Sequence, residues 1–117
     1  MKALNCRKAG LLDTWSRHAW RDGVQLDSLE DLTSLVVRTE NSTYEVTIIC
    51  ARSGEVVVRG GRYFPEFVPA RIAGSSLRGS FLKVGGVYAG FSLEIQTQTR
   101  VIITSRIQSV AVTPLPG

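Results

Sequence analysis

Apolar and polar residues alternate most regularly between residues 34 and 59, where three apolar runs are separated by two polar turns. In the central run, residues 44–50, every second side chain is apolar, and a period of two places such side chains on one face of a β-strand. We predict that this face lines a core. Its members are Tyr44, Val46, Ile48 and Cys50.

The runs on either side of this strand are also typical of β structure. Residues 35–39 and 55–59 are rich in valine, and β-branched residues favour the pleated surface of a sheet. Gly54 can adopt the positive φ that a short hairpin loop requires, while Asn41 and Ser42 form the local hydrogen bonds that close turns. The three runs therefore predict an antiparallel meander.

Short apolar runs separated by turn residues continue to the end of the chain. Residues 60–65 combine two glycines with Pro65 and predict a loop or corner, because proline cannot donate a hydrogen bond to a sheet. Residues 68–73 predict a short strand, and residues 74–80 a turn of small polar residues. Further strands are expected at 81–84 and at 88–96, where Phe91, Leu93 and Ile95 share the core face.

The last two apolar runs, residues 100–105 and 107–113, are separated by too little chain for a hairpin loop. We therefore predict one long strand, bent by a β-bulge near Ser105 or Arg106. A bulge re-aims side chains, so these two residues could face the same opening as the predicted turn at 74–80. Together they could supply guanidinium, hydroxyl and backbone donors for an anion, although the bend could equally serve only to close the fold.

About seven short strands with glycines at their bends predict an all-β fold, namely a small antiparallel β-barrel of six to seven strands over residues 34–117. An immunoglobulin-type sandwich is disfavoured because Cys6 and Cys50 are poorly placed for its bridge. The short strands, the glycines at bends and the net positive charge resemble those of small nucleic-acid-binding barrels such as the oligonucleotide-binding and Sm-like folds. Neither fold's diagnostic motif is present, so the likeness covers architecture only.

Residues 1–33 are expected to form a partly helical N-terminal segment that packs on or caps the barrel. Apolar side chains at helical spacing predict a short helix over residues 11–20. Leucines at every third position from Leu26 to Leu35 predict one turn of α- or 3₁₀-helix. Trp15 and Trp20 either close one end of the β core or mark a contact surface.

The composition predicts one soluble domain. The chain has 117 residues, of which 44% are hydrophobic and 21% charged, and its apolar runs are far shorter than the roughly 20 residues of a membrane-spanning helix. We expect a cytoplasmic protein with two free thiols, Cys6 and Cys50, since no secretory signal pattern is apparent. No metal site or cofactor is expected, because one histidine and two cysteines give no usual ligand spacing.

Positive charge is concentrated in the β region. The formal net charge is +4, and basic and acidic groups balance over residues 1–33, so the excess lies after residue 33 and consists mainly of arginine. Arginine suits planar, bidentate contacts with phosphate. We therefore expect a non-enzymatic binding module whose basic face contacts nucleic acid or another polyanion, unless these arginines only keep the sheet surface soluble. The candidate contacts are Arg59, Arg62, Arg71, Arg78, Ser105 and Arg106.

Two other function classes stay open. Outward-facing Ile49, Val57 and Ile102 would favour a structural module that forms homo-oligomers through its strand edges. A small enzyme would have to use His18, the only histidine of the chain, which is flanked by Trp15 and Trp20. A surface or cap role for His18 is the simpler interpretation, since it has no titrating partner nearby in sequence.

Overall fold

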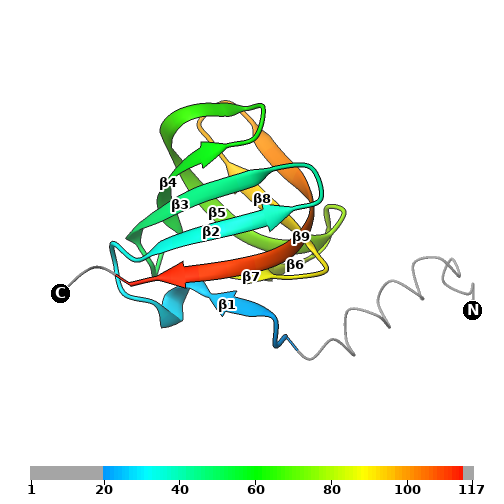
Figure 1. Cartoon of the computed structure of the whole chain (residues 1–117), viewed down its shortest axis with the longest axis horizontal. Coiled ribbons are helices and arrows are strands. Elements are labelled where there is room, and N and C mark those ends of the chain that lie inside the picture. Colours follow the sequence, from blue (N-terminus) through cyan, green and yellow to red (C-terminus); the bar gives the residue numbers. More distant parts are fainter. Residues whose placement is uncertain (1–19, 115–117) are drawn as a thin grey trace, which may run out of the picture.

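The structure, a computed structural model, describes residues 20–114, and nearly all of the regular structure in this range is β-strand (Figure 1). One 3₁₀ turn, η1 (Leu26–Ser28), is also present. No helix within residues 20–114 is long and apolar enough to cross a membrane. The strands are β1 (Gly23–Gln25), β2 (Ser34–Thr39), β3 (Thr43–Cys50), β4 (Glu55–Gly60), β5 (Phe64–Leu77), β6 (Ser80–Val84), β7 (Gly86–Tyr88), β8 (Ser92–Gln96) and β9 (Val101–Thr113).

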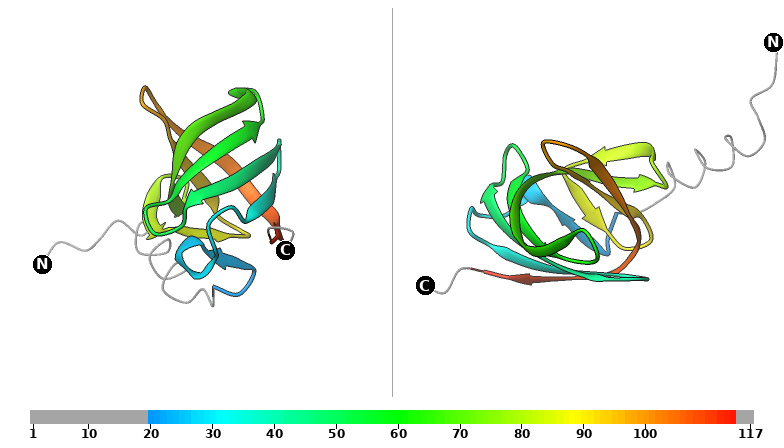
Figure 2. Two further views of the ribbon diagram at one scale, coloured as in Figure 1. Left: turned by 90° about the vertical axis from the view of Figure 1, so that its left-hand side faces the viewer. Right: turned by 90° about the horizontal axis from the view of Figure 1, so that it is seen from above.

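Six of these strands pair in a closed ring. The main sheet has the order β4-β3-β2-β9-β8-β5-β6, and β4 also pairs with β5, so the pairing returns to its starting strand (Figure 2). Each of these pairings is antiparallel. Strand β6 extends the sheet beside the second half of β5, and β1 pairs separately with β7. The strongly bent strand β5 is therefore shared by three neighbours.

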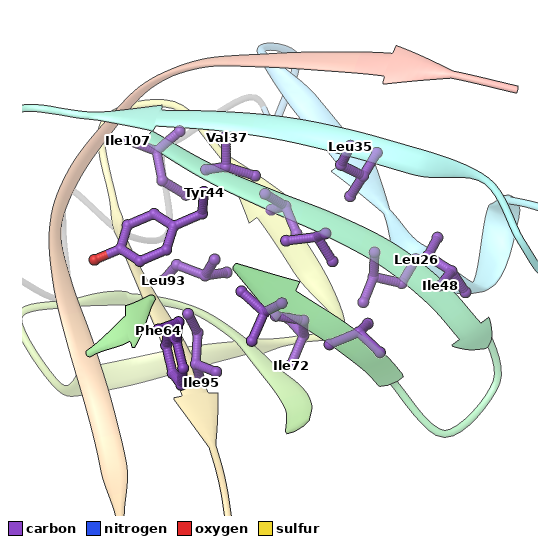
Figure 3. Packing of buried hydrophobic residues seen from close by; sticks show 14 of the residues in the cluster. Leu26, Leu35, Val37, Tyr44, Ile48, Phe64, Ile72, Leu93, Ile95 and Ile107 are labelled. Carbon is purple, nitrogen blue, oxygen red and sulfur yellow. The ribbon is translucent and has the colours of Figure 1, made fainter. Parts of the chain in front are cut away.

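The alternating runs predicted from the sequence supply the core inside this ring (Figure 3). Tyr44, Val46 and Ile48 of β3 are buried, as predicted. Phe91, Leu93 and Ile95 are also buried, but the single strand predicted over residues 88–96 is interrupted, since β7 ends at Tyr88 and β8 begins at Ser92. Burying a side chain of this size stabilises the folded state by about 1.5–3 kcal/mol.

One end of the ring is closed by the segment that precedes β2. Leu26 of η1 is fully buried in the core cluster, and its N–H donates to the Gly85 carbonyl oxygen over 2.8 Å. Trp20 stacks on Phe91 with ring centroids 4.9 Å apart and meets Tyr88 edge to face at 5.0 Å. We call this region, made of Trp20, β1, η1 and β7, the closed end. The 3₁₀ turn predicted for the leucine run is confirmed, whereas Trp15 and nearly all of the predicted helix at 11–20 lie outside the described residues.

The polar turn predicted for residues 74–80 is wrong. Gly74, Ser75 and Ser76 lie inside β5 and are buried, and the chain turns only at Arg78 and Gly79. Small residues occur here because other backbone segments approach closely. A Cβ atom on Gly74 would lie 2.0 Å from the Lys83 carbonyl oxygen. The Ser75 hydroxyl donates to the Gly86 carbonyl and accepts from the Tyr88 N–H, which satisfies it without water.

The single long C-terminal strand with a bulge is confirmed as β9. Along β8 and β9, Ser92 pairs with Arg106 while Glu94 pairs with Ile103, so β9 has one residue more than β8 between these pairs. This extra residue reverses the alternation of inward and outward side chains. The prediction that Ile102 faces outward is wrong: Ile102 lies before the bulge, pairs with Ile95 and is buried, whereas Val101 and Ile103 are exposed.

A second bulge corrects the assignment of Cys50. The register between β3 and β4 shifts between Ile48 and Cys50, which displaces the end of β3 from its regular alternation. Cys50 is only partly buried instead of lying on the core face. It is a free thiol, and hydrogen bonding from Ser53 lowers its pKa. Cys6 lies outside the described residues.

Candidate functional site

Two hairpin turns rise at the end of the ring opposite the closed end. They are the β4–β5 turn (residues 61–63) and the β8–β9 turn (residues 97–100), both at the top of Figure 1. Because β4 and β8 both pair with β5, both turns flank the same strand. Between them lies a groove of about 520 Å³, which we call the two-turn groove. Its lining includes Arg62, Tyr63, Phe64, Pro69, Thr97 and Arg100.

Two glycines give the β4–β5 turn its shape. Gly60 and Gly61 have φ values of 132° and 61°, in the region that side chains other than glycine rarely adopt. A Cβ atom on Gly61 would also lie 2.8 Å from the Tyr44 hydroxyl oxygen, so only glycine lets the turn fold closely over that ring. The next two residues, Arg62 and Tyr63, are consequently exposed.

The β8–β9 turn is held by its own hydrogen bonds. The Thr97 N–H donates to the Arg100 carbonyl over 2.9 Å, and the Thr97 hydroxyl oxygen accepts from the N–H groups of Thr99 and Arg100 over 3.3 and 3.2 Å. This arrangement is a Ser/Thr turn, in which a side chain takes the place of a backbone partner. The backbone of Arg100 is thus fixed before any ligand arrives.

The two-turn groove is basic and partly aromatic. Arg62 and Arg100 contribute two guanidinium groups, and none of the lining residues is acidic. The Arg100 guanidinium carbon lies 5.7 Å from the centroid of the Tyr63 ring, within the range of cation–π attraction. Tyr63 nevertheless remains 49% exposed, so a large part of its ring is accessible. The arrangement can therefore offer positive charge and an aromatic surface to one ligand.

A buried tyrosine supports the floor of the groove. Tyr44 lies edge to face against Phe64, with ring centroids 6.5 Å apart (Figure 3). Phe64 in turn lines the groove. Burial raises the pKa of the Tyr44 hydroxyl above its ordinary value of 10.0, because the phenolate would lose hydration. At neutral pH the floor is therefore uncharged, and Arg62 and Arg100 set the charge of the groove.

Of the arginines selected from the sequence, Arg62 lies in the groove and Arg59 lies outside it. Arg59 is exposed on β4, where its guanidinium forms an ion pair of 2.7 Å with Glu45. Its guanidinium carbon also lies 4.5 Å from the centroid of the Phe67 ring. Its charge is thus balanced locally, which makes it a weaker candidate for binding an anion.

Arg71 borders a neighbouring groove on the outer surface. This outer groove, of about 580 Å³, lies between β3, β4, β5 and the β8–β9 turn, and its lining includes Ile49, Val57, Pro69 and Ala70. The Arg71 guanidinium donates from Nε to the Ser53 carbonyl oxygen over 2.9 Å. The outer groove is therefore mostly apolar, with one arginine at its border.

The other three predicted residues lie elsewhere. Arg78 is in the β5–β6 turn, so the whole length of β5 separates it from Arg62. The Ser105 hydroxyl accepts from the Asn41 N–H, and the Arg106 N–H donates to a Glu40 side-chain oxygen, which places both beside the β2–β3 turn. The six candidates therefore do not form one cluster. The β5–β6 turn does lie near this part of β9, since Ser76 pairs with Ser92 and Ser92 with Arg106, but only residues 78 and 79 of the predicted turn form it.

Sequence reasoning missed Arg100. The sequence predicts it at the start of a strand, and its closeness to Tyr63 depends on the pairing of both β4 and β8 with β5. The short segment 97–100 indicates an exposed arginine, because threonine at its first position closes a turn, but it does not indicate that Tyr63 lies nearby.

No group of three or more histidine, cysteine, aspartate or glutamate side chains within residues 20–114 could hold a metal ion. His18, the candidate catalytic residue, lies outside the described residues, as does Trp15. No family model, curated protein or solved structure matches the chain. The function must therefore be inferred from the geometry of the two-turn groove.

Proposed function

We propose that this protein is a small β-barrel binding module, without catalytic activity of its own, that binds single-stranded nucleic acid in the two-turn groove. The observation that carries the proposal is the pairing of Arg62 and Arg100 with an exposed tyrosine ring in a groove that has no acidic lining residue. Proteins that bind single strands combine basic grooves with aromatic rings on which bases stack.

Each groove residue has a role in this proposal. Arg62 and Arg100 contact phosphates from the two turns, and their fork-shaped guanidinium groups suit bidentate contacts with phosphate oxygens. A base stacks on Tyr63, which is a contact that tolerates any sequence because every base has a π-face. The apolar floor at Phe64 and Pro69 excludes water from beneath the ligand. The barrel holds both turns in place.

The test is a titration of a fluorescently labelled oligothymidylate, followed by anisotropy at several salt concentrations. Two phosphate contacts on a single strand predict that the logarithm of the association constant falls with the logarithm of salt with a slope of about −1.4. The variant Arg100→Ala should reduce the magnitude of that slope by about 0.7. Tyr63→Ala should weaken binding by about 1–3 kcal/mol while leaving the slope unchanged.

Arg38→Ala is the matched control, because it removes one exposed arginine of β2 that does not line the groove. It should bind as tightly as the unaltered protein. Loss of binding in this variant equal to that in Arg100→Ala would mean that overall charge, and not the groove, attracts the strand. Absence of binding at the lowest salt concentration would refute the proposal.

A structural role in assembly is the second candidate, and exposed apolar residues of β9 favour it. Val101 and Ile103 are 57% and 47% exposed on adjacent outward positions of one strand. Exposed apolar side chains of this kind are frequent at contacts between protein copies. Light scattering tests the idea, since a monomer at high concentration would contradict it.

We also infer that the protein acts in the cytoplasm. A free, partly exposed thiol at Cys50 suits a reducing compartment, and nucleic acid is available there. Cell fractionation with an antibody against the protein checks this inference, and recovery in an extracellular fraction would refute it.

A further inference from the structure

The outer groove is continuous with the two-turn groove. Pro69, Thr97 and Gln98 line both, so they form a shared wall over which one ligand can pass. Val68 lines the first groove and Ala70 lines the second, and these positions on β5 are separated by about 6.6 Å at a rise of about 3.3 Å per residue. The two grooves are thus neighbouring compartments along β5.

The outer groove differs from the first in chemistry. Its floor is apolar and includes Ile49, which is 46% exposed, and Val57, which is half-buried. Its border carries the amide side chains of Gln96 and Gln98. Arg71 and Glu55 lie opposite each other on paired strands, so the outer groove has no excess of basic charge. It can hold a flat apolar group with polar edges, but it is not built for a second phosphate.

A nucleobase has the properties that this compartment fits. Its faces are apolar enough to lie on Ile49 and Val57, and its edge presents donors and acceptors that glutamine amides can match. We propose that the outer groove binds the next base of the same strand, so that the ligand unit is at least a dinucleotide with one base on Tyr63 and the next in the outer groove. This inference rests on the proposed function of the two-turn groove.

The experiment compares three ligands as competitors of the labelled oligothymidylate. They are thymidine 5′-monophosphate, thymidine 3′,5′-bisphosphate and the 5′-phosphorylated thymidine dinucleotide. The bisphosphate supplies a second phosphate without a second nucleoside, so its comparison with the dinucleotide measures the contribution of that nucleoside. The bisphosphate carries the greater negative charge, so an advantage of the dinucleotide cannot come from charge. We expect the dinucleotide to bind about fivefold or more tightly than the bisphosphate, because stacking and burial of one base contribute about 1–3 kcal/mol.

Two matched variants assign this gain to the outer groove. Ile49→Ser should abolish the advantage of the dinucleotide and leave the affinity for the monophosphate unchanged. Ile103→Ser alters a side chain of nearly equal exposure on β9, 47% against 46%, and should leave both affinities unchanged. Gln98 lines both grooves, so Gln98→Ala would affect both and could not separate them.

The outcomes separate the two proposals. Equal affinity for the dinucleotide and the bisphosphate, with both bound, would overturn the second-base site and leave the two-turn groove in place. An advantage that persists in Ile49→Ser would also overturn the second-base site, because the base would then bind elsewhere. If none of the three ligands competes and the labelled strand itself does not bind, the proposed function fails and the second-base site with it.

Discussion

Strand β5 passes from one end of the molecule to the other, and its two halves have opposite surroundings. Residues 65–71 are exposed or partly exposed, pair with β4 and carry Pro69 into both grooves. Residues 72–76 are buried except for the partly exposed Ala73, and they lie against β6, β7 and β8. One continuous strand thus contributes to an open end with grooves and to a closed end that is packed.

The residue types of the two halves follow from this difference. At the closed end, Gly74 and Ser75 let other backbone segments come close, and the buried hydroxyl replaces missing backbone partners. At the open end, Pro65 and Pro69 have no backbone N–H to donate a hydrogen bond within the sheet. Their rings fix φ, however, and so stiffen the chain beneath the grooves. We conclude that the closed end supplies stability, whereas the open end can vary its side chains at little cost to the fold.

The largest effect on stability is expected for Leu26→Ala. Leu26 is fully buried at the closed end, and truncation of such a leucine leaves a cavity that costs about 2–5 kcal/mol. Urea denaturation followed by circular dichroism measures the change in the free energy of unfolding. Leu32→Ala is the control, because Leu32 is 48% exposed, and it should stay within about 0.5 kcal/mol of the unaltered protein. Equal effects of the two variants would contradict a packed closed end.

A smaller loss is expected for Ser75→Ala. The change removes the hydroxyl between the Gly86 carbonyl and the Tyr88 N–H and leaves both without this partner in a buried place. An unsatisfied buried polar group costs about 1–3 kcal/mol. Ser80→Ala, at an exposed position of β6, is the comparison for the same denaturation assay. A Ser75→Ala protein as stable as the Ser80→Ala protein would mean that β7 is not held to β5 by this hydroxyl.

The free energy of unfolding is expected to depend modestly on pH in the alkaline range, because Tyr44 is buried beneath the open end. The pKa of Tyr44 is raised in the folded protein by burial, so folding favours the protonated phenol. The contribution is fully present below about pH 10 and is lost as the pH rises through the raised pKa. The free energy of unfolding should therefore fall between about pH 9 and pH 11 by less in Tyr44→Phe than in the unaltered protein. Identical pH profiles would show that Tyr44 ionises as freely in the folded state as in the unfolded chain.

The smallest effect on stability is expected for Arg62→Ala and Arg100→Ala. Both side chains are exposed, and surface substitutions of this kind change the free energy of unfolding by less than about 0.5 kcal/mol. The same variants should lose most of their affinity for the labelled strand. Thermal unfolding and anisotropy, measured on one preparation, give both quantities. A large loss of stability in either variant would remove the distinction between the two ends.

Local patterns were sufficient to predict most strands and the core face of β3. Alternation identified Tyr44, Val46 and Ile48 correctly because a regular strand has a fixed period. It failed at Cys50 because a bulge shifts the register at the end of β3. It failed at Ile102 because three apolar residues in a row, residues 101–103, do not show which of them faces inward. The turn predicted for residues 74–80 is too long, because glycine and serine are typical both of turns and of strands that other backbone segments approach closely.

The candidate site could be predicted from the sequence less completely than the fold. Arg62 could be selected because two glycines before it indicate a turn. Its closeness to the β8–β9 turn, and with it the role of Arg100, depends on which strands flank β5. That order is a property of the whole ring and leaves no signal in either segment alone. For the same reason Arg59 could not be distinguished from Arg62, since its partner Glu45 lies on another strand.

The pairing of the first strand of the ring with the last has a consequence for how the protein folds. Ser34 at the start of β2 pairs with Thr113 at the end of β9, and every other ring strand lies between them in the chain. The β2–β3 and β3–β4 hairpins can form early, because their strands are close in sequence. Closure must wait for the most distant contact, which is typical of slow folding in β proteins. On the ribosome, the ring can close only after β9 has emerged, so the core remains accessible to chaperones until the last strand is made.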